Sequence, residues 1–170
     1  MKKVLITLII MHNSYAYGEN PTVKGRLFCI NKCQKICKFI QKVNPRISEA
    51  KAKTMEESIE FYSLYRELDS KMVAALIATE TDFRNISLKN TNNTKDHGYC
   101  QINTVWIKEF KRLKRRPLDI KQLYNFNYCV DRMTEILVIY KKDYLRYHSR
   151  NKKVQKKYKK RLDKKLKLFK

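Results

Sequence analysis

Apolar residues recur along most of this chain at three- and four-residue steps, the spacing of helices that bury one face. The pattern predicts a helix over residues 48–65 and another that begins at Asp69 or Ser70, either of which can act as its N-cap. Further helices are expected over residues 105–113 and 118–147, whereas the polar stretch 84–97 is expected to be a loop. The predicted fold class is all-α.

Glu80 lies at the end of the second predicted helix. Because Met72, Leu76 and Glu80 are four residues apart, Glu80 is expected at the edge of the buried stripe. Partial burial and the helix C-terminus both disfavour a negative charge there. A glutamate that keeps its proton near neutral pH can act as a general acid. The alternative is a solvated helix-end glutamate with no catalytic role.

Gly98 is the only glycine after Gly25, and it stands between a polar stretch and an apolar, aromatic one. A single glycine in that setting predicts a residue with positive φ or a close approach of two backbone segments.

Two short motifs together resemble the soluble lytic transglycosylase family. They are Glu80-Thr81-Asp82-Phe83 and, after a polar loop, Gly98-Tyr99-Cys100-Gln101-Ile102-Asn103. The family pattern is Glu-Ser-x-Phe, a short loop, then Gly-Leu-Met-Gln-Ile. Thr81 here replaces the serine, and Tyr99-Cys100 replaces Leu-Met. The family's later Tyr-Asn-x-Gly is matched by Tyr147-His148-Ser149, without the glycine.

The resemblance implies a lysozyme-like all-α domain with a cleft between helices. Glu80 would be the single general acid and base, and the substrate would contact Thr81, Gln101, Asn103 and Tyr147, with Tyr147 also hydrogen-bonded to Glu80. The implied reaction cleaves the β-1,4 bond between N-acetylmuramic acid and N-acetylglucosamine in peptidoglycan glycan strands. It leaves a 1,6-anhydro end and needs no metal or cofactor. Small exported members of the family open the wall for secretion or conjugation machines, so such an apparatus is a further expected partner.

A hydrolytic lysozyme of the same fold is the nearest alternative. Most glycosidases use two carboxylates, and the second candidates close to Glu80 in sequence are Asp82 and Asp96.

Composition says more about the class of partner than about the fold. The 170 residues suffice for one domain, and a hydrophobic share of 43% is that of a globular chain. The net charge of +23 implies an anionic partner, whether nucleic acid, acidic lipid or an anionic cell wall.

Residues 1–16 have the pattern of a secretory signal peptide. Lys2 and Lys3 precede an apolar run over residues 4–11, and Ser14-Tyr15-Ala16 supplies small residues for cleavage after Ala16. We therefore expect a periplasmic or secreted protein of the cell envelope, with the wall rather than a specific nucleic acid as the anionic partner. The alternatives are an uncleaved anchor and a buried N-terminal helix.

Three of the five cysteines, Cys29, Cys33 and Cys37, are four residues apart and would stack on one face of a helix. Apolar packing or a disulfide to another segment is expected, because no fourth metal ligand stands at a suitable spacing. Cys100 and Cys129 could pair with each other after export. At least one cysteine is left unpaired in a monomer.

The basic tail repeats apolar residues every four positions at Val154, Tyr158, Leu162 and Leu166. It predicts an amphipathic helix that docks on the domain or lies on an anionic envelope surface. The expected organisation is a signal peptide (1–16), a cysteine-containing segment (17–45), a catalytic domain (46–150) and the tail (151–170). A non-catalytic helical protein that binds nucleic acid or membrane through the tail would explain the charge, but not the motifs from Glu80 to Asn103.

Overall fold

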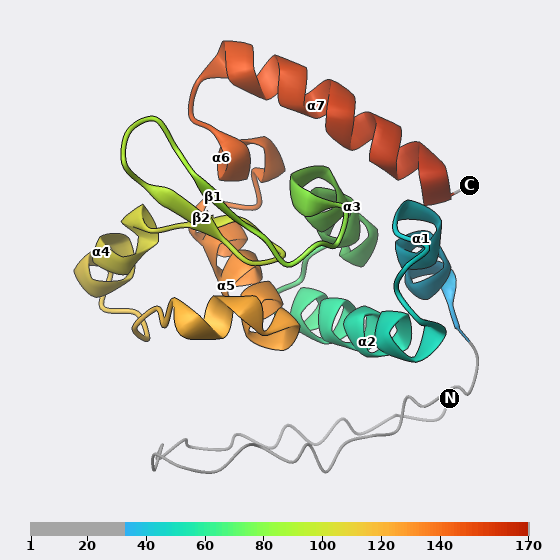
Figure 1. Ribbon diagram of the computed structural model, residues 1–170. Coiled ribbons are helices and arrows are strands. Elements are labelled where there is room, and N and C mark those ends of the chain that lie inside the picture. The colour runs from blue at the N-terminus through green and yellow to red at the C-terminus, as the bar shows by residue number, and fades with distance from the viewer. Residues whose placement is uncertain (1–32, 170) are drawn as a thin grey trace, which may run out of the picture. The chain divides into compact units, whose positions relative to one another are not determined.

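The computed structural model describes residues 33–169, which form seven α-helices, two short 3-10 helices and three short strands (Figure 1). In chain order the elements are α1 Lys35–Val43, α2 Glu49–Tyr65, α3 Ser70–Thr81, β1 Ser87–Lys89, β2 Lys95–His97, β3 Ile102–Asn103, α4 Val105–Arg112, η1 Lys121–Tyr124, α5 Phe126–Ile139, α6 Tyr144–His148, α7 Lys152–Leu166 and η2 Lys167–Phe169. The mostly helical class is confirmed. The predicted signal peptide and Cys29 lie outside the described residues.

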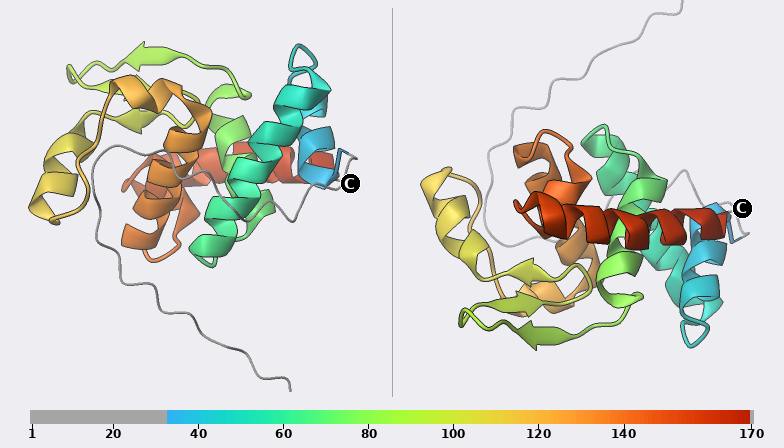
Figure 2. Two further views of the ribbon diagram at one scale, coloured as in Figure 1. Left: turned by 90° about the horizontal axis from the view of Figure 1, so that it is seen from below. Right: turned by 90° about the horizontal axis from the view of Figure 1, so that it is seen from above.

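The helix that carries Glu80, α3, is at the centre of the core. Every residue from Val73 to Thr79 is buried, as expected of a helix covered on all sides. It packs against α1, α2 and α7, and Figure 2 shows α7 lying across it. Its first turn is fixed by Asp69, whose Oδ1 accepts hydrogen bonds from the backbone N–H groups of Lys71 and Met72. The predicted N-cap and helix are confirmed.

The segment 84–97, predicted as a loop, contains two strands of a small antiparallel sheet with the order β1-β2-β3. The loop prediction was therefore wrong over β1 and β2. Strand β1 has only three residues, all of them exposed, so it is too short to show the sustained alternation of apolar and polar positions by which a strand is recognised. Asp96 in β2 pairs with Asn103 in β3, which places both side chains on one face of the sheet.

The long helix predicted over residues 118–147 is divided into η1, α5 and α6. Asn125 caps α5 through its side chain and Asp143 caps α6. Lys141 and Lys142 between α5 and α6 both have positive φ, which a helix does not allow. None of the helices between Cys33 and Phe169 is long and apolar enough to cross a membrane.

The basic tail docks on the domain. All described residues belong to one compact unit, and the inner face of α7 buries Tyr158 and Leu162 at 1% and 3% exposure. The end of the chain returns to α1, where the rings of Phe39 and Phe169 stack at 3.9 Å. The boundaries expected after residues 45 and 150 therefore lie inside one packed unit.

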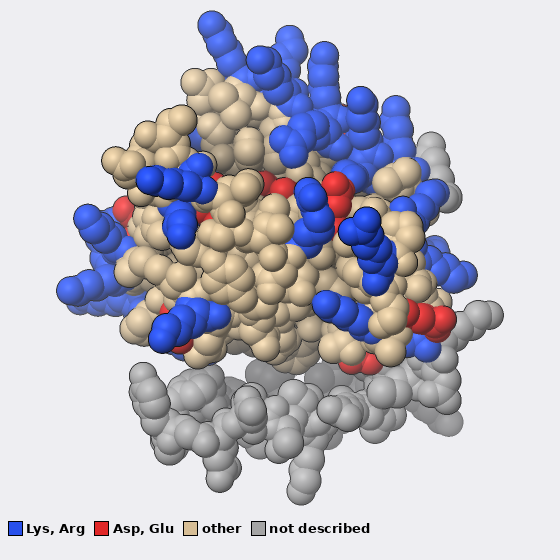
Figure 3. Space-filling view, in the orientation of Figure 1, with Lys and Arg blue, Asp and Glu red and all other residues tan. Residues whose placement is uncertain are grey.

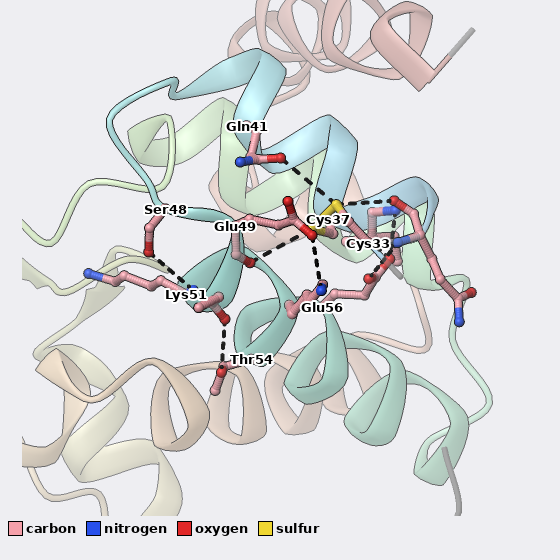
Figure 4. The surroundings of a disulfide bond; sticks show 12 residues. Cys33, Cys37, Gln41, Ser48, Glu49, Lys51, Thr54 and Glu56 are labelled. Carbon is pink, nitrogen blue, oxygen red and sulfur yellow. Dashed lines mark hydrogen bonds and ion pairs between the residues drawn. A yellow bond between two sulfur atoms is a disulfide. The ribbon is translucent and has the colours of Figure 1, made fainter. Parts of the chain in front are cut away.

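Cys33 and Cys37 form a disulfide at the start of α1 (Figure 4). The bond joins two residues of the cysteine-containing segment and does not reach another segment as expected. Beside it, the buried Glu56 of α2 accepts hydrogen bonds from the N–H groups of Ile36 (2.9 Å) and Cys37 (3.0 Å). A carboxylate at this end also complements the helix dipole, so α2 supplies the cap that α1 lacks in its own sequence.

Cys100 and Cys129, the pair suggested for a second disulfide, are both buried free thiols. The N–H of Cys100 donates to Sγ of Cys129 at 3.2 Å, and burial raises the pKa of the Cys100 thiol well above its usual value. The two side chains therefore serve as apolar packing between the turn at Gly98 and helix α5.

Candidate functional site

A cleft of about 720 Å³ lies beside the C-terminal end of α3. One wall comes from the hairpin formed by β1 and β2, together with β3 and the start of α4. The other wall comes from α6 and α7. Its lining includes Glu80, Asn90, Asn92, Thr94, Asp96, Gln101, Asn103, Trp106, Tyr147, His148, Arg146, Arg150 and Arg161. Polar side chains thus dominate a hollow that four parts of the chain build together.

Glu80 lies in the last turn of α3 with a side chain that is 10% exposed. Its Oε1 accepts a 2.7 Å hydrogen bond from the hydroxyl of Tyr158. Burial and the nearby Glu80 carboxyl raise the pKa of Tyr158 well above its usual value, so this hydroxyl keeps its proton and acts as the donor. The predicted position of Glu80 at the edge of the buried stripe is confirmed.

The expected hydrogen bond from Tyr147 to Glu80 was wrong. Tyr147 lines the cleft, but its hydroxyl donates to the backbone oxygen of Cys100 at 2.7 Å. The short helix α6 directs this side chain at the glycine turn, whereas α7 brings Tyr158 to the carboxyl from 78 residues away in sequence. Tyr158 was visible in the sequence as the only member of the apolar seam with a polar tip.

His148 covers Tyr158 on the cleft side. The two rings stack at 4.1 Å with an interplanar angle of 11°, and Nδ1 of His148 lies 3.5 Å from Oε1 of Glu80. His148 is thus exposed in part and also lies close to the candidate acid.

A network of amides surrounds Asp96 on the opposite wall. Asn103 donates to Oδ1 of Asp96 at 2.7 Å and Asn90 donates to Oδ2 at 2.9 Å. Asn103 also donates to the hydroxyl of Thr94 at 2.9 Å. The cross-strand pairing of Asp96 with Asn103 makes this network possible.

Gln101 and Thr81, the remaining predicted contacts, differ in position. Gln101 lines the cleft and donates from Nε2 to the backbone oxygens of Gly98 (2.8 Å) and Ile86 (3.1 Å). Its buried Oε1 has no hydrogen-bond partner among residues 33–169. Thr81 is buried at 1% exposure, does not line the cleft and donates to the backbone oxygen of Tyr99. The structure therefore brings Glu80, Gln101, Asn103 and Tyr147 together and places Thr81 behind them as a support.

Both features predicted for Gly98, a positive φ and a close approach of two backbone segments, are confirmed. Its φ is +69°, and a Cβ at this position would lie 2.0 Å from the backbone oxygen of Leu123. No side chain fits there, so glycine allows the turn before Gln101 to pack directly against the backbone of η1.

Asp82, the other acidic candidate near Glu80, is the left-handed C-cap of α3 and pairs with Lys165 of α7. It does not line the cleft. In the part of the chain that the structure describes, no three His, Cys, Asp or Glu side chains are grouped so that they could hold a metal ion.

Comparison of the chain with protein-family models, with curated proteins and with solved structures finds no match.

Proposed function

We propose that this chain is a peptidoglycan lytic transglycosylase with a lysozyme-like fold, in which Glu80 is the single general acid and base. The observation that carries the proposal is a mostly buried carboxyl group that opens on a polar cleft of about 720 Å³. Ligand clefts of small molecules and sugars have volumes of this order. The N–H groups of Gln101 and Asn103 already donate within the protein. Oε1 of Gln101, which has no hydrogen-bond partner among the described residues, is the acceptor left for a sugar hydroxyl or an N-acetyl N–H.

In the proposed reaction Glu80 protonates the glycosidic oxygen while the bond from that oxygen to C1 of the muramic sugar breaks. The electron pair of the bond leaves with the oxygen. The carboxylate then takes the proton of the C6 hydroxyl as the C6 oxygen bonds to C1, which closes the 1,6-anhydro ring. Glu80 recovers its proton and no water is consumed. Since Oε1 accepts the hydroxyl of Tyr158, Oε2 is the oxygen left for the proton transfer.

Hydrolysis by the same fold is a second candidate, because Asp96 lines the same cleft as Glu80. Two side-chain amides donate to its two oxygens and hold the side chain in place. In a hydrolase Asp96 would position a water molecule or stabilise the developing positive charge on the sugar. In a transglycosylase the role of Asp96 would be structural, because the same hydrogen bonds tie it to Asn90 and Asn103.

The mass of the released products separates these candidates. Digestion of purified peptidoglycan by the full chain is expected to release fragments with anhydro-muramic ends, each lighter by one water than the hydrolytic product. Reducing ends, and their loss in Asp96→Asn, would favour hydrolysis. No release of fragments would leave the basic, non-catalytic binding protein as the better account.

The cellular setting is also a proposal. The enzyme would be exported, as the pattern of residues 1–16 predicts, and would act in the cell envelope on glycan strands. A secretion or conjugation apparatus is the further partner that the resemblance implies.

A further inference from the structure

Helix α7 has two different faces. Its inner face buries Gln155, Tyr158 and Leu162 against the domain. Nine of its fifteen residues are lysine or arginine and one is aspartate, and Figure 3 shows these blue side chains gathered over α7. The sequence left open whether the tail docks on the domain or faces an anionic partner, and this arrangement allows both at once.

Four lysines form a regular row on the outer face: Lys153, Lys157, Lys160 and Lys164. They are separated by four, three and four residues, so they lie on one side of the helix, and all are exposed. The row extends over about 16 Å at the helical rise of 1.5 Å per residue. No carboxylate among the described residues pairs with them, whereas Lys159 and Lys165 are paired with Asp163 and Asp82.

The row suits an anionic polymer better than a lipid bilayer. A helix that binds a membrane surface buries an apolar face among the lipids. In α7 the large apolar side chains face the domain, and only Val154, at 38% exposure, is available on the outside. The outer face therefore offers charge without an apolar anchor.

The basic surface continues into the cleft. Arg161 of α7 lines the cleft of Glu80, together with Arg146 and Arg150 from the segment that leads into α7. A single strand could thus lie in the cleft while its charged substituents reach the outer face of the helix.

We propose that the lysine row of α7 is a second, non-catalytic binding site for carboxylate or phosphate groups carried by the wall polymer that occupies the cleft. The identity of the polymer rests on the proposed function. The site has a consequence for the candidate acid, because Tyr158 is on the opposite face of the same helix. Bound anions would reduce the repulsion among the lysines and stabilise the helix that holds the Tyr158 hydroxyl on Glu80.

The test measures binding separately from cleavage. The full chain with Glu80→Gln, which leaves the wall intact, is sedimented with purified walls at low and high salt. Replacing Lys153, Lys157, Lys160 and Lys164 by glutamine in this background is expected to weaken binding about tenfold at low salt and to lower its salt dependence. The matched control replaces Lys108, Lys111, Lys114 and Lys121, which are exposed and outside the cleft, and removes the same charge. It is expected to weaken binding less than about twofold.

Equal losses in the two variants would overturn the proposal, because net charge would then explain the binding. A row variant that keeps wall binding but loses binding to vesicles of phosphatidylglycerol and phosphatidylcholine would overturn it in favour of a membrane. Stronger competition by duplex DNA than by soluble anionic wall fragments would overturn it in favour of nucleic acid. If the wild-type chain releases no wall fragments while the row variant still loses wall binding, the proposed function fails and the binding site stands.

Discussion

Replacing Tyr158 by phenylalanine removes one oxygen atom from the site and leaves the rest of the α7 contact in place. The ring keeps its packing in the core and its stacking on His148. What is lost is the 2.7 Å hydrogen bond to Oε1 of Glu80. Hydrogen bonds to charged groups contribute about 1.5–3 kcal/mol, and each 1.4 kcal/mol is a factor of ten in rate. If the bond is fully used in the transition state, the rate of wall cleavage falls by about ten- to a hundredfold.

The assay is the initial rate of clearing of a peptidoglycan suspension, followed over a range of wall concentrations. Because the lost hydrogen bond is made to the carboxyl that transfers the proton, the maximal rate is expected to fall while the wall concentration at half the maximal rate stays the same. A purely structural role for Tyr158 would lower the melting temperature together with the rate.

The matched control is Tyr147→Phe, which removes the hydroxyl of the other cleft tyrosine. That hydroxyl donates to the backbone oxygen of Cys100, so the change should lower stability by about 1–2 kcal/mol and leave the maximal rate within about twofold of the wild type. A full maximal rate in Tyr158→Phe would refute the reasoning, and a loss of maximal rate in Tyr147→Phe alone would favour the assignment that the resemblance implied.

Three further changes test the scaffold around the site. Glu56→Ala should destabilise the fold by about 2 kcal/mol in urea titrations, because two buried N–H groups at the start of α1 lose their acceptor. The control is Glu57→Ala at an exposed position, which should change stability by less than about 0.5 kcal/mol. Gly98→Ala should lower stability by more than about 2 kcal/mol or prevent folding, since its Cβ would overlap the Leu123 backbone; a melting temperature equal to the wild type would contradict this contact. Deletion of residues 151–170 should abolish cleavage even of small soluble wall fragments, because it removes Tyr158 and Leu162 from the core; retained activity on such fragments would show that α7 serves only to bind the wall.

The sequence was most informative where a single residue type decides the local structure. Only glycine fits the positive φ and the backbone contact at position 98, so its isolated occurrence could be interpreted directly. Asp69 was recognised as a cap because an acceptor is needed before an apolar helix. Glu80 followed from helical periodicity, which fixes the face on which a side chain lies.

Contacts between distant segments could not be predicted in the same way. The apolar seam of α7 predicted a buried face, but nothing in its spacing shows that Tyr158 meets a carboxyl 78 residues earlier. The resemblance pointed to Tyr147 because a motif is matched by its position along the sequence. Which tyrosine bonds to Glu80 depends instead on which helix packs against it, and that helix is α7. Strand β1 was missed because its three exposed residues are too few to form a recognisable periodic pattern.

The most direct test of the central claim compares wall cleavage by the wild-type chain, by Glu80→Gln and by the control Glu67→Gln. Glutamine keeps the shape of Glu80 and an oxygen for the Tyr158 hydroxyl, so the fold should be retained, while the proton needed for cleavage is absent. Glu67 is an exposed glutamate at 88% side-chain exposure. The account predicts that Glu80→Gln releases no wall fragments and that Glu67→Gln releases them at the wild-type rate; undiminished release by Glu80→Gln would contradict it.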